Sequence, residues 1–254
     1  MEKLSISQPS PLSPTLWPAD AFSVRRCLIF VATVAGAFAI GLACASIAVL
    51  LGGPAPIRSG KNLQLTSGLL LAQIVAYIPL IAAALPLLPF AARRTLREIG
   101  LHAPTAADIR AGALGAVAMY VVAEAAALAQ KFALHVEGTQ QAVELFGTTH
   151  DRTLIYGLIV LAVFIAPVVE EVIFRGFVFN ALLRYVPVGI AAVSSGVIFG
   201  LAHFDRTAFF PLACGGIVLA VVYYKTGSLV SSMLTHGTFN AANVVLVLVT
   251  GGKG

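Results

Sequence analysis

Long apolar stretches, separated by short polar connectors, run along most of the chain. A hydrocarbon core about 30 Å thick is crossed by about 20 predominantly apolar residues in a helix. The pattern predicts helical spans at about residues 27–51, 65–90, 111–130, 153–184, 188–204, 208–224 and 228–250. We therefore expect an all-α fold, a polytopic transmembrane helix bundle with about seven spans, within a range of six to eight.

The first 26 residues differ from the rest of the chain. Residues 1–26 are rich in Ser and Pro and end in a basic pair, which predicts a flexible polar N-terminal tail. The first apolar run, 27–51, is too long for the apolar region of a signal peptide, so we expect it to remain as a span. Residues 27–254 are predicted to form one transmembrane domain. The segment QQAVELF, at 140–146, predicts a short interfacial helix.

The composition is that of a membrane protein, and this alters the interpretation of the positive net charge. Hydrophobic residues make up 59% of the chain and charged residues 11%, against roughly 25% charged in a soluble domain, and mean hydropathy is +0.93. The net charge of +5 does not indicate nucleic-acid binding, because Lys and Arg lie mostly between apolar segments, where they fix topology. We expect an inner (plasma) membrane protein of a bacterium. The distribution of basic residues favours a cytoplasmic N-terminus, with these residues on the inner side: Arg25, Arg26, Arg93, Arg94, Arg97, Arg110, Arg184 and Lys225. Three cysteines without CxxC spacing support neither a disulfide framework nor a cysteine zinc site.

The segment APVVEEVIFRGF, residues 166–177, places three charges inside the fourth span. Each costs at least about 2.5 to 3.5 kcal/mol at the centre of a membrane helix, so they need partners. Glu171 and Arg175 are four residues apart with the acid first, the favoured order for an ion pair on one helix face. Glu170 lies about 100° further round the helix and has no charged partner there. It must be protonated, bind a metal or meet a basic group on another helix.

Two histidines in later spans are the candidate partners of Glu170. His203 ends the segment FGLAH, and His236 begins HGTFNAAN, in which Asn240 and Asn243 share its helix face. A carboxylate with imidazoles can activate water for amide hydrolysis, and an asparagine can donate to the developing oxyanion. Glu170, His203 and His236 could equally form an open Zn²⁺ site. The residues alone leave both mechanisms open.

The motifs EEVIFR (Glu170, Glu171, Arg175), FGLAH (Phe199, His203) and HGTFN (His236, Asn240) occur in this order on successive apolar segments. Together they resemble the EExxxR, FxxxH and HxxxN motifs of the CPBP family, the CAAX proteases and bacteriocin-processing enzymes also called Abi proteins, over about residues 150–250. The resemblance implies an intramembrane endopeptidase, and a lipidated or C-terminal-tail segment of a membrane protein or peptide as substrate. It implies that Glu170 and His203 activate water, that His236 and Asn240 hold the oxyanion, and that Glu171 and Arg175 brace the site. It favours a metal-free, glutamate-dependent mechanism, with zinc as the alternative.

The motifs can meet only if the fourth helix is long. A helix over about 153–184 would extend about 47 Å and place Glu170 near mid-depth, and we expect Pro167 to kink it. Two other functions fit parts of the pattern. One is a non-catalytic protein of the same family that binds a membrane partner or confers bacteriocin immunity. The other is a proton-coupled transporter using Glu170 and Glu124, which lacks the paired broken helices typical of that class.

Overall fold

The computed structural model describes residues 17–52, 58–59, 62–63, 67–136, 146, 149 and 151–250. Within them, six helices are long and apolar enough to span a membrane, and a seventh apolar helix is shorter, so the predicted helix bundle is confirmed. The helical elements are α1 (Val24–Gly52), α2 (Ser67–Ala92), α3 (Ala106–Leu134), α5 (Arg152–Val160), η2 (Leu161–Ile165), α6 (Ala166–Glu171), η3 (Val172–Phe179), α7 (Asn180–Leu183), α8 (Val188–Ala202), α9 (Phe209–Thr226) and α10 (Leu229–Thr250). Two short strands, β1 (Arg58–Ser59) and β2 (Asn62–Leu63), pair antiparallel.

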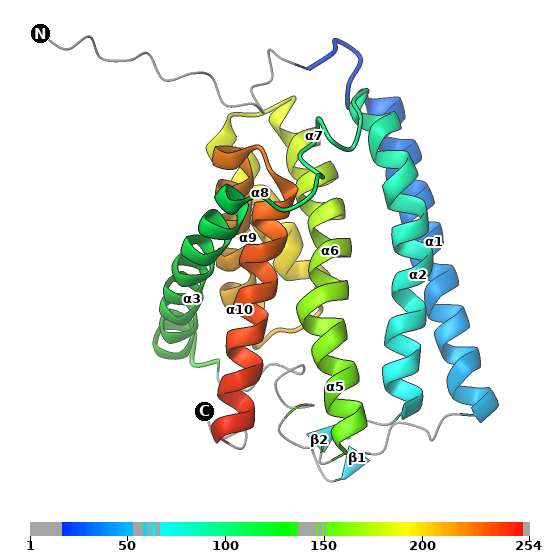
Figure 1. Ribbon diagram of the computed structural model, residues 1–254, viewed down its shortest axis with the longest axis vertical. Helices are drawn as coiled ribbons and strands as arrows, with labels where there is room; N and C mark the ends of the chain where they lie inside the picture. Colours follow the sequence, from blue (N-terminus) through cyan, green and yellow to red (C-terminus); the bar gives the residue numbers. More distant parts are fainter. Residues whose placement is uncertain are drawn as a thin grey trace, which may run out of the picture.

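One long helix organises the bundle. Elements α5 to α7 join end to end into a single span of 32 residues, Arg152–Leu183, which confirms the helix predicted over 153–184. Figure 1 shows this helix between the antiparallel pair α1–α2 and the group formed by α3, α9 and α10. Near Pro167, where a kink was predicted, the helix contains a π-helical turn, Leu161–Ile165, which ends two residues before the proline. The motif helix is therefore in contact with both halves of the bundle.

The segment predicted as a span at 188–204 is shorter than expected. Helix α8 has 15 residues and is about 22 Å long, less than the thickness of a hydrocarbon core. It ends at Ala202 with His203 as its C-cap, and the next residue, Phe204, has a left-handed φ of 51°. The Asp205 carboxylate then accepts hydrogen bonds from the Thr207 backbone and hydroxyl, which orders the turn into α9. This early turn places His203 within the bundle.

The end of the predicted flexible tail is packed against the bundle. Helix α1 begins at Val24, and Trp17, Ala21 and Phe22 are buried ahead of it. The Phe22 amide donates to the carbonyl of Ala91 at the end of α2. The prediction of a tail over 1–26 is thus wrong for 17–26, because the two aromatic residues there bury apolar surface. Residues 1–16 lie outside the described residues, as does the predicted interfacial helix at 140–146 except for Phe146, which is helical and buried.

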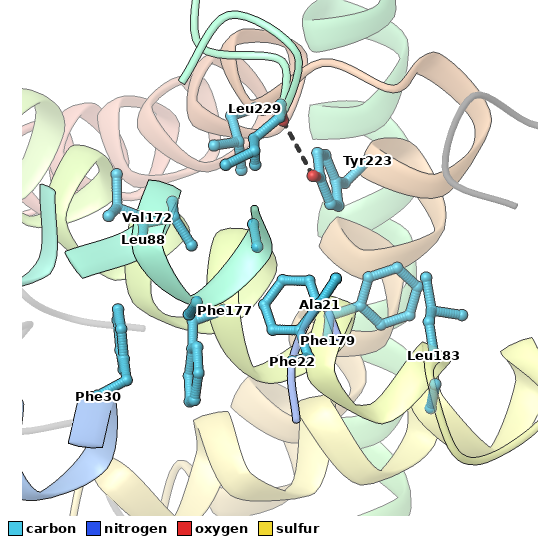
Figure 2. Close-up of a cluster of buried hydrophobic side chains, with 14 of the residues drawn as sticks. Ala21, Phe22, Phe30, Leu88, Val172, Phe177, Phe179, Leu183, Tyr223 and Leu229 are labelled. Carbon is cyan, nitrogen blue, oxygen red and sulfur yellow. Dashed lines mark hydrogen bonds between the residues drawn. The ribbon is translucent and has the colours of Figure 1, made fainter. Parts of the chain in front are cut away.

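Two apolar clusters fix the long helix along its length. The first joins the N-terminal segment to α1, α2, η3 and α9, and it includes a stacked pair of rings, Phe30 and Phe177, whose centroids are 3.7 Å apart (Figure 2). The second lies towards the other end, where Leu158 and Leu161 pack with Val244 of α10. Glu170 lies between these two stretches of the long helix, so the polar site is held between two packed apolar regions.

A buried carboxylate joins the starts of α3 and α10. Asp108 forms a capping box with Thr105 at the first turn of α3. Its other oxygen accepts hydrogen bonds from the hydroxyls of Ser228 and Ser231, at 2.6 and 2.7 Å. The Asp108 side chain thereby accepts hydrogen bonds at the N-termini of both helices, where the first backbone N–H groups have no partner within the helix. This contact fixes the start of α10, the helix that carries the third motif.

Candidate active site

Glu170 meets both motif histidines in the structure. Its Oε2 atom lies 3.8 Å from Nε2 of His203 and 3.9 Å from Nε2 of His236. The three residues come from α6, from the end of α8 and from α10. The side chains of Glu170 and His203 keep 16% and 25% exposure, so a small molecule can reach them. The glutamate that lacked a partner on its own helix therefore faces two basic groups from other helices.

Both imidazoles are oriented through their Nδ1 atoms. Nδ1 of His203 lies 2.8 Å from the backbone carbonyl oxygen of Phe199, and Nδ1 of His236 lies 3.0 Å from a carboxylate oxygen of Glu171. A carbonyl or carboxylate oxygen only accepts, so each Nδ1 carries the hydrogen. In the neutral rings, each Nε2 then presents a lone pair towards Glu170. Three acceptors that converge at 3.8 to 3.9 Å need a shared hydrogen donor, and a water molecule can supply two hydrogens.

Glu171 is the centre of a buried network that braces these groups. It is fully buried and forms the predicted ion pair with Arg175, with Nη1 3.0 Å from Oε1. The same Oε1 receives His236, and Oε2 accepts from the hydroxyl of Ser232 at 2.5 Å. Arg175 also donates to the backbone carbonyl of Gly216 on α9 at 2.8 Å. Two adjacent glutamates therefore differ in environment: one is enclosed in a buried network, and the other faces a partly open site.

Asn240 binds the backbone that the π-helical turn leaves unpaired. The Ala166 amide bonds to Leu161, five residues back, and Pro167 has no N–H to offer the preceding turn. The Ala162 carbonyl thus lacks its usual helical donor, and Nδ2 of Asn240 donates to it at 2.8 Å. An amide nitrogen carries two hydrogens, so this contact uses one of the two donors. Asn240 therefore joins α10 to the distorted turn that precedes Glu170.

The remaining predicted residues separate into two groups. Phe199 is fully buried, with its ring centroid 4.6 Å from that of His203 and 4.7 Å from the Arg175 guanidinium carbon, so it packs within the site. Asn243 was predicted to support the site, but its amide donates to Phe239 within α10 at 3.0 Å. Glu124 is exposed on α3. The structure thus brings Phe199 into the site and assigns Asn243 a bond inside its own helix.

The motifs did not reveal two polar contacts of the site. The Tyr77 hydroxyl of α2 donates to Oε1 of Glu170 at 3.2 Å. Ser232 of α10 binds Glu171. A polar side chain in an otherwise apolar span is the signal that could have identified Tyr77, and Ser232 lies one helical turn before His236. Neither position has a spacing that would distinguish it from an ordinary packing residue.

The zinc alternative receives no support from the geometry of the site. Across the part of the chain that the structure describes, no group of three or more His, Cys, Asp or Glu is arranged to hold a metal ion. Cys27, Cys44 and Cys214 are free thiols. The side chains of the candidate site itself provide a carboxylate from Glu170, imidazoles from His203 and His236, and an amide from Asn240.

Comparison with known proteins agrees with the resemblance read from the motifs. Residues 152–242 match the family model described as type II CAAX prenyl endopeptidase Rce1-like. Over 91 residues the chain is 29% identical to a Bacillus subtilis protein named "Putative membrane peptidase YdiL", covering 36% of this chain and 37% of that protein. Over 96 residues it is 30% identical to an uncharacterized protein of Mycoplasma capricolum, covering 36% of this chain and 28% of the relative.

These matches are confined to about a third of the chain. They cover less than two thirds of either relative's own length, and no solved structure gives a significant match. The matched region contains all three motifs and the whole of the long helix. It leaves out α1, α2 and α3, so the contact from Tyr77 comes from outside the region of family similarity.

Proposed function

We propose, on the premise that residues 152–242 belong to the Rce1-like family of CAAX prenyl endopeptidases, that this integral membrane protein is an endopeptidase. It hydrolyses a peptide bond in a membrane-associated protein or peptide, and water is the nucleophile. The observation that carries the proposal is the convergence of Oε2 of Glu170 with the Nε2 atoms of His203 and His236. The relative named as a membrane peptidase supports the same general activity.

Water activation is assigned to Glu170 and His203. Their facing atoms are 3.8 Å apart, too far for a direct hydrogen bond, and one water molecule can donate to both. Glu170 takes a proton as the water oxygen attacks the scissile carbonyl carbon. The same proton then passes to the leaving amide nitrogen as the C–N bond breaks. The carboxylate is regenerated, so it acts first as base and then as acid.

The oxyanion is assigned to His236 and Asn240. This role requires His236 to carry a second proton, on Nε2, in place of the lone pair that the neutral ring presents there; Nδ1 remains bound to Glu171. The second N–H of Asn240, beyond the one given to Ala162, is the other donor. Donors fixed before the reaction stabilise the developing charge without reorganisation. The buried network and the distorted turn thus supply the rigidity that this part of the mechanism needs.

The proposed substrate is a segment close to the membrane surface or within the bilayer, including lipidated C-terminal tails. We assign the cytoplasmic side to the end of the bundle that holds the N-terminal segment, the end of α2 and the end of α7 (Figure 1). These segments are joined there by Arg26 to Phe90 and by Arg184 to Ala19. The concentration of Lys and Arg at this end agrees with the positive-inside rule.

The test uses purified protein and an internally quenched peptide that ends in farnesyl-cysteine and three further residues. Glu170→Gln should lower the cleavage rate by about 10²- to 10⁴-fold, because general-base catalysis is lost. Glu124→Gln, which changes an exposed glutamate on another span, is the matched control and should cleave as wild type does. In parallel, the termini of membrane proteins are compared by mass spectrometry in cells that express each variant at equal abundance.

Two outcomes separate the proposed enzyme from a non-catalytic relative. Termini that are processed with wild type and left intact with Glu170→Gln support the endopeptidase, whether or not the prenylated peptide is cleaved. If every terminus is identical in the two strains and the peptide is cleaved equally, Glu170 has no catalytic role. If instead neither protein cleaves the peptide and every terminus is as in cells that lack the protein, the non-catalytic protein that binds a membrane partner is the better description.

A further inference from the structure

Tyr77 contacts the proposed catalytic carboxylate from a helix that lies outside the region of family similarity. Its hydroxyl donates to Oε1 of Glu170 at 3.2 Å, across 93 positions of sequence. The family match begins at residue 152, and α2 ends at Ala92. The three motifs provide the histidines that face Glu170, and α2 provides a hydroxyl group at the opposite oxygen of the same carboxylate.

The two oxygens of Glu170 have different partners. Oε1 accepts from Tyr77, and Oε2 faces the two imidazoles. The terminal torsion of a glutamate is broad and only roughly two-fold, so a free carboxylate would sample many orientations. A donor held at one oxygen restricts this rotation and keeps the other oxygen directed at the histidines. The contact therefore determines which atom meets the water.

Tyr77 is itself held in place by packing. It packs against the apolar cluster that contains Leu158 and Leu161 of the long helix and Leu70 of its own helix. Gly157 allows close approach here, because a Cβ at that position would lie within van der Waals overlap of the Leu70 side chain. Helix α2 is thus closely packed on the helix that carries Glu170, and this packing fixes the position of the Tyr77 hydroxyl.

We infer that Tyr77 is a positioning residue of the proposed endopeptidase and that α2 is a structural part of the active site. The catalytic part of this inference rests on the proposed function. The hydrogen bond between Tyr77 and Glu170 is independent of it. The titratable and charged groups around Glu170 are Tyr77 from α2, His203 from α8, His236 from α10 and Arg175 from its own helix, which acts at longer range. Among the residues that the structure describes, Tyr77 is the one with a hydrogen bond to Oε1.

The kinetic test is Tyr77→Phe, which removes one oxygen and keeps the ring. With the quenched farnesyl-cysteine peptide as probe, kcat should fall about 10- to 100-fold, the scale of a hydrogen bond to a charged group, while KM changes by less than about twofold. The pH–rate profile should also differ from that of the wild type, because the variant lacks the hydroxyl that contacts the proposed general base. A purely structural role would lower the amount of active enzyme and leave the profile unchanged.

Two controls isolate the hydroxyl from packing. Ile74→Val trims the same apolar cluster one turn away on α2, and Tyr156→Phe removes a hydroxyl from an exposed tyrosine of the long helix. Both should retain wild-type kcat and pH profile. If Tyr77→Phe matches these controls while Glu170→Gln is inactive, the positioning role is wrong and the proposed function stands.

A spectroscopic measurement needs no substrate. The infrared carboxylate band of Glu170, isolated as the difference between the wild type and Glu170→Gln, should shift when Tyr77→Phe is introduced into both. An unshifted band shows that Tyr77 does not bind Glu170 and overturns the inference. If the band shifts but Glu170→Gln cleaves membrane substrates normally, the contact is real, and both the proposed function and the catalytic role of Tyr77 are wrong.

Discussion

Nδ1 of His236 lies 3.0 Å from Oε1 of Glu171, so the second glutamate of the first motif holds the histidine of the third. The same carboxylate oxygen pairs with Arg175, which in turn binds the carbonyl of Gly216. Four helical elements are joined through this one buried side chain and its partners. The adjacent Glu170 approaches the other ring nitrogen of His236, at 3.9 Å, and remains partly accessible.

Because the two neighbouring glutamates differ in environment, we expect substitution of Glu171 to lower stability and substitution of Glu170 to lower the cleavage rate. Glu171→Gln leaves the fully buried Arg175 without its counter-charge and should destabilise the protein by about 3 to 5 kcal/mol. Glu170→Gln should lower the cleavage rate by about 10²- to 10⁴-fold with little change in stability. The measurement is thermal unfolding of both variants in the same detergent, beside the peptide assay. Equal melting temperatures for the two variants would contradict the assignment of Glu171 to a structural network.

Asn240 and Pro167 should be energetically coupled. In the wild type, Asn240→Ala leaves the Ala162 carbonyl without a donor and should cost about 1 kcal/mol, the scale of hydrogen bonds between membrane helices. Pro167→Ala restores a backbone N–H that can serve the preceding turn. In that background, Asn240→Ala should cost less. A double-mutant cycle on unfolding free energies measures the difference, and strictly additive effects would exclude the proposed link between the proline, the π-helical turn and Asn240.

The helical layout could be predicted because membrane spans have a strong and local signal. Apolar length alone identified the segments, and the requirement that Glu170 meet His203 correctly predicted the long helix Arg152–Leu183. The Glu171–Arg175 pair followed from helical spacing. The packed segment before α1 was missed, since Trp17 and Phe22 lie among Ser and Pro residues and bury themselves only against α2 and η3.

The site could be predicted only as far as motif residues and one-helix geometry allow. Contacts between helices depend on the rotation and translation of each helix relative to its neighbours. A local stretch of sequence does not determine these quantities. The Asn240 contact depends on a π-helical turn, and the hydrophobic periodicity of the sequence does not predict that turn. Tyr77 is one tyrosine in an apolar span, and its role becomes visible only when α2 packs on α6. Asn243 shares a helix face with His236, yet it bonds within α10.

Cleavage should not depend on a bound divalent metal. In the proposed mechanism, the Glu170 carboxylate and the His203 imidazole activate the water themselves, and their facing atoms lie 3.8 Å apart. Prolonged dialysis against 1,10-phenanthroline or EDTA should therefore leave the rate of peptide cleavage within about twofold of the untreated enzyme, because general acid–base catalysis by these side chains needs no metal. Loss of activity that added Zn²⁺ restores would instead assign Glu170, His203 and His236 as ligands.

Gly237 permits the contact that places the third motif beside the distorted turn. A Cβ at this position would lie 2.6 Å from the carbonyl oxygen of Val163, so α10 and the long helix could not keep their present approach. Gly237→Ala should destabilise the protein by about 1 to 3 kcal/mol, as overpacking does. It should also lower kcat, because the displaced backbone carries His236. Gly189→Ala is the matched control, since a Cβ there meets nothing within 4 Å and alanine favours the helix. Unfolding in detergent and peptide cleavage are measured for both variants, and a Gly237→Ala protein as stable and active as the Gly189→Ala protein would show that this close approach is not needed.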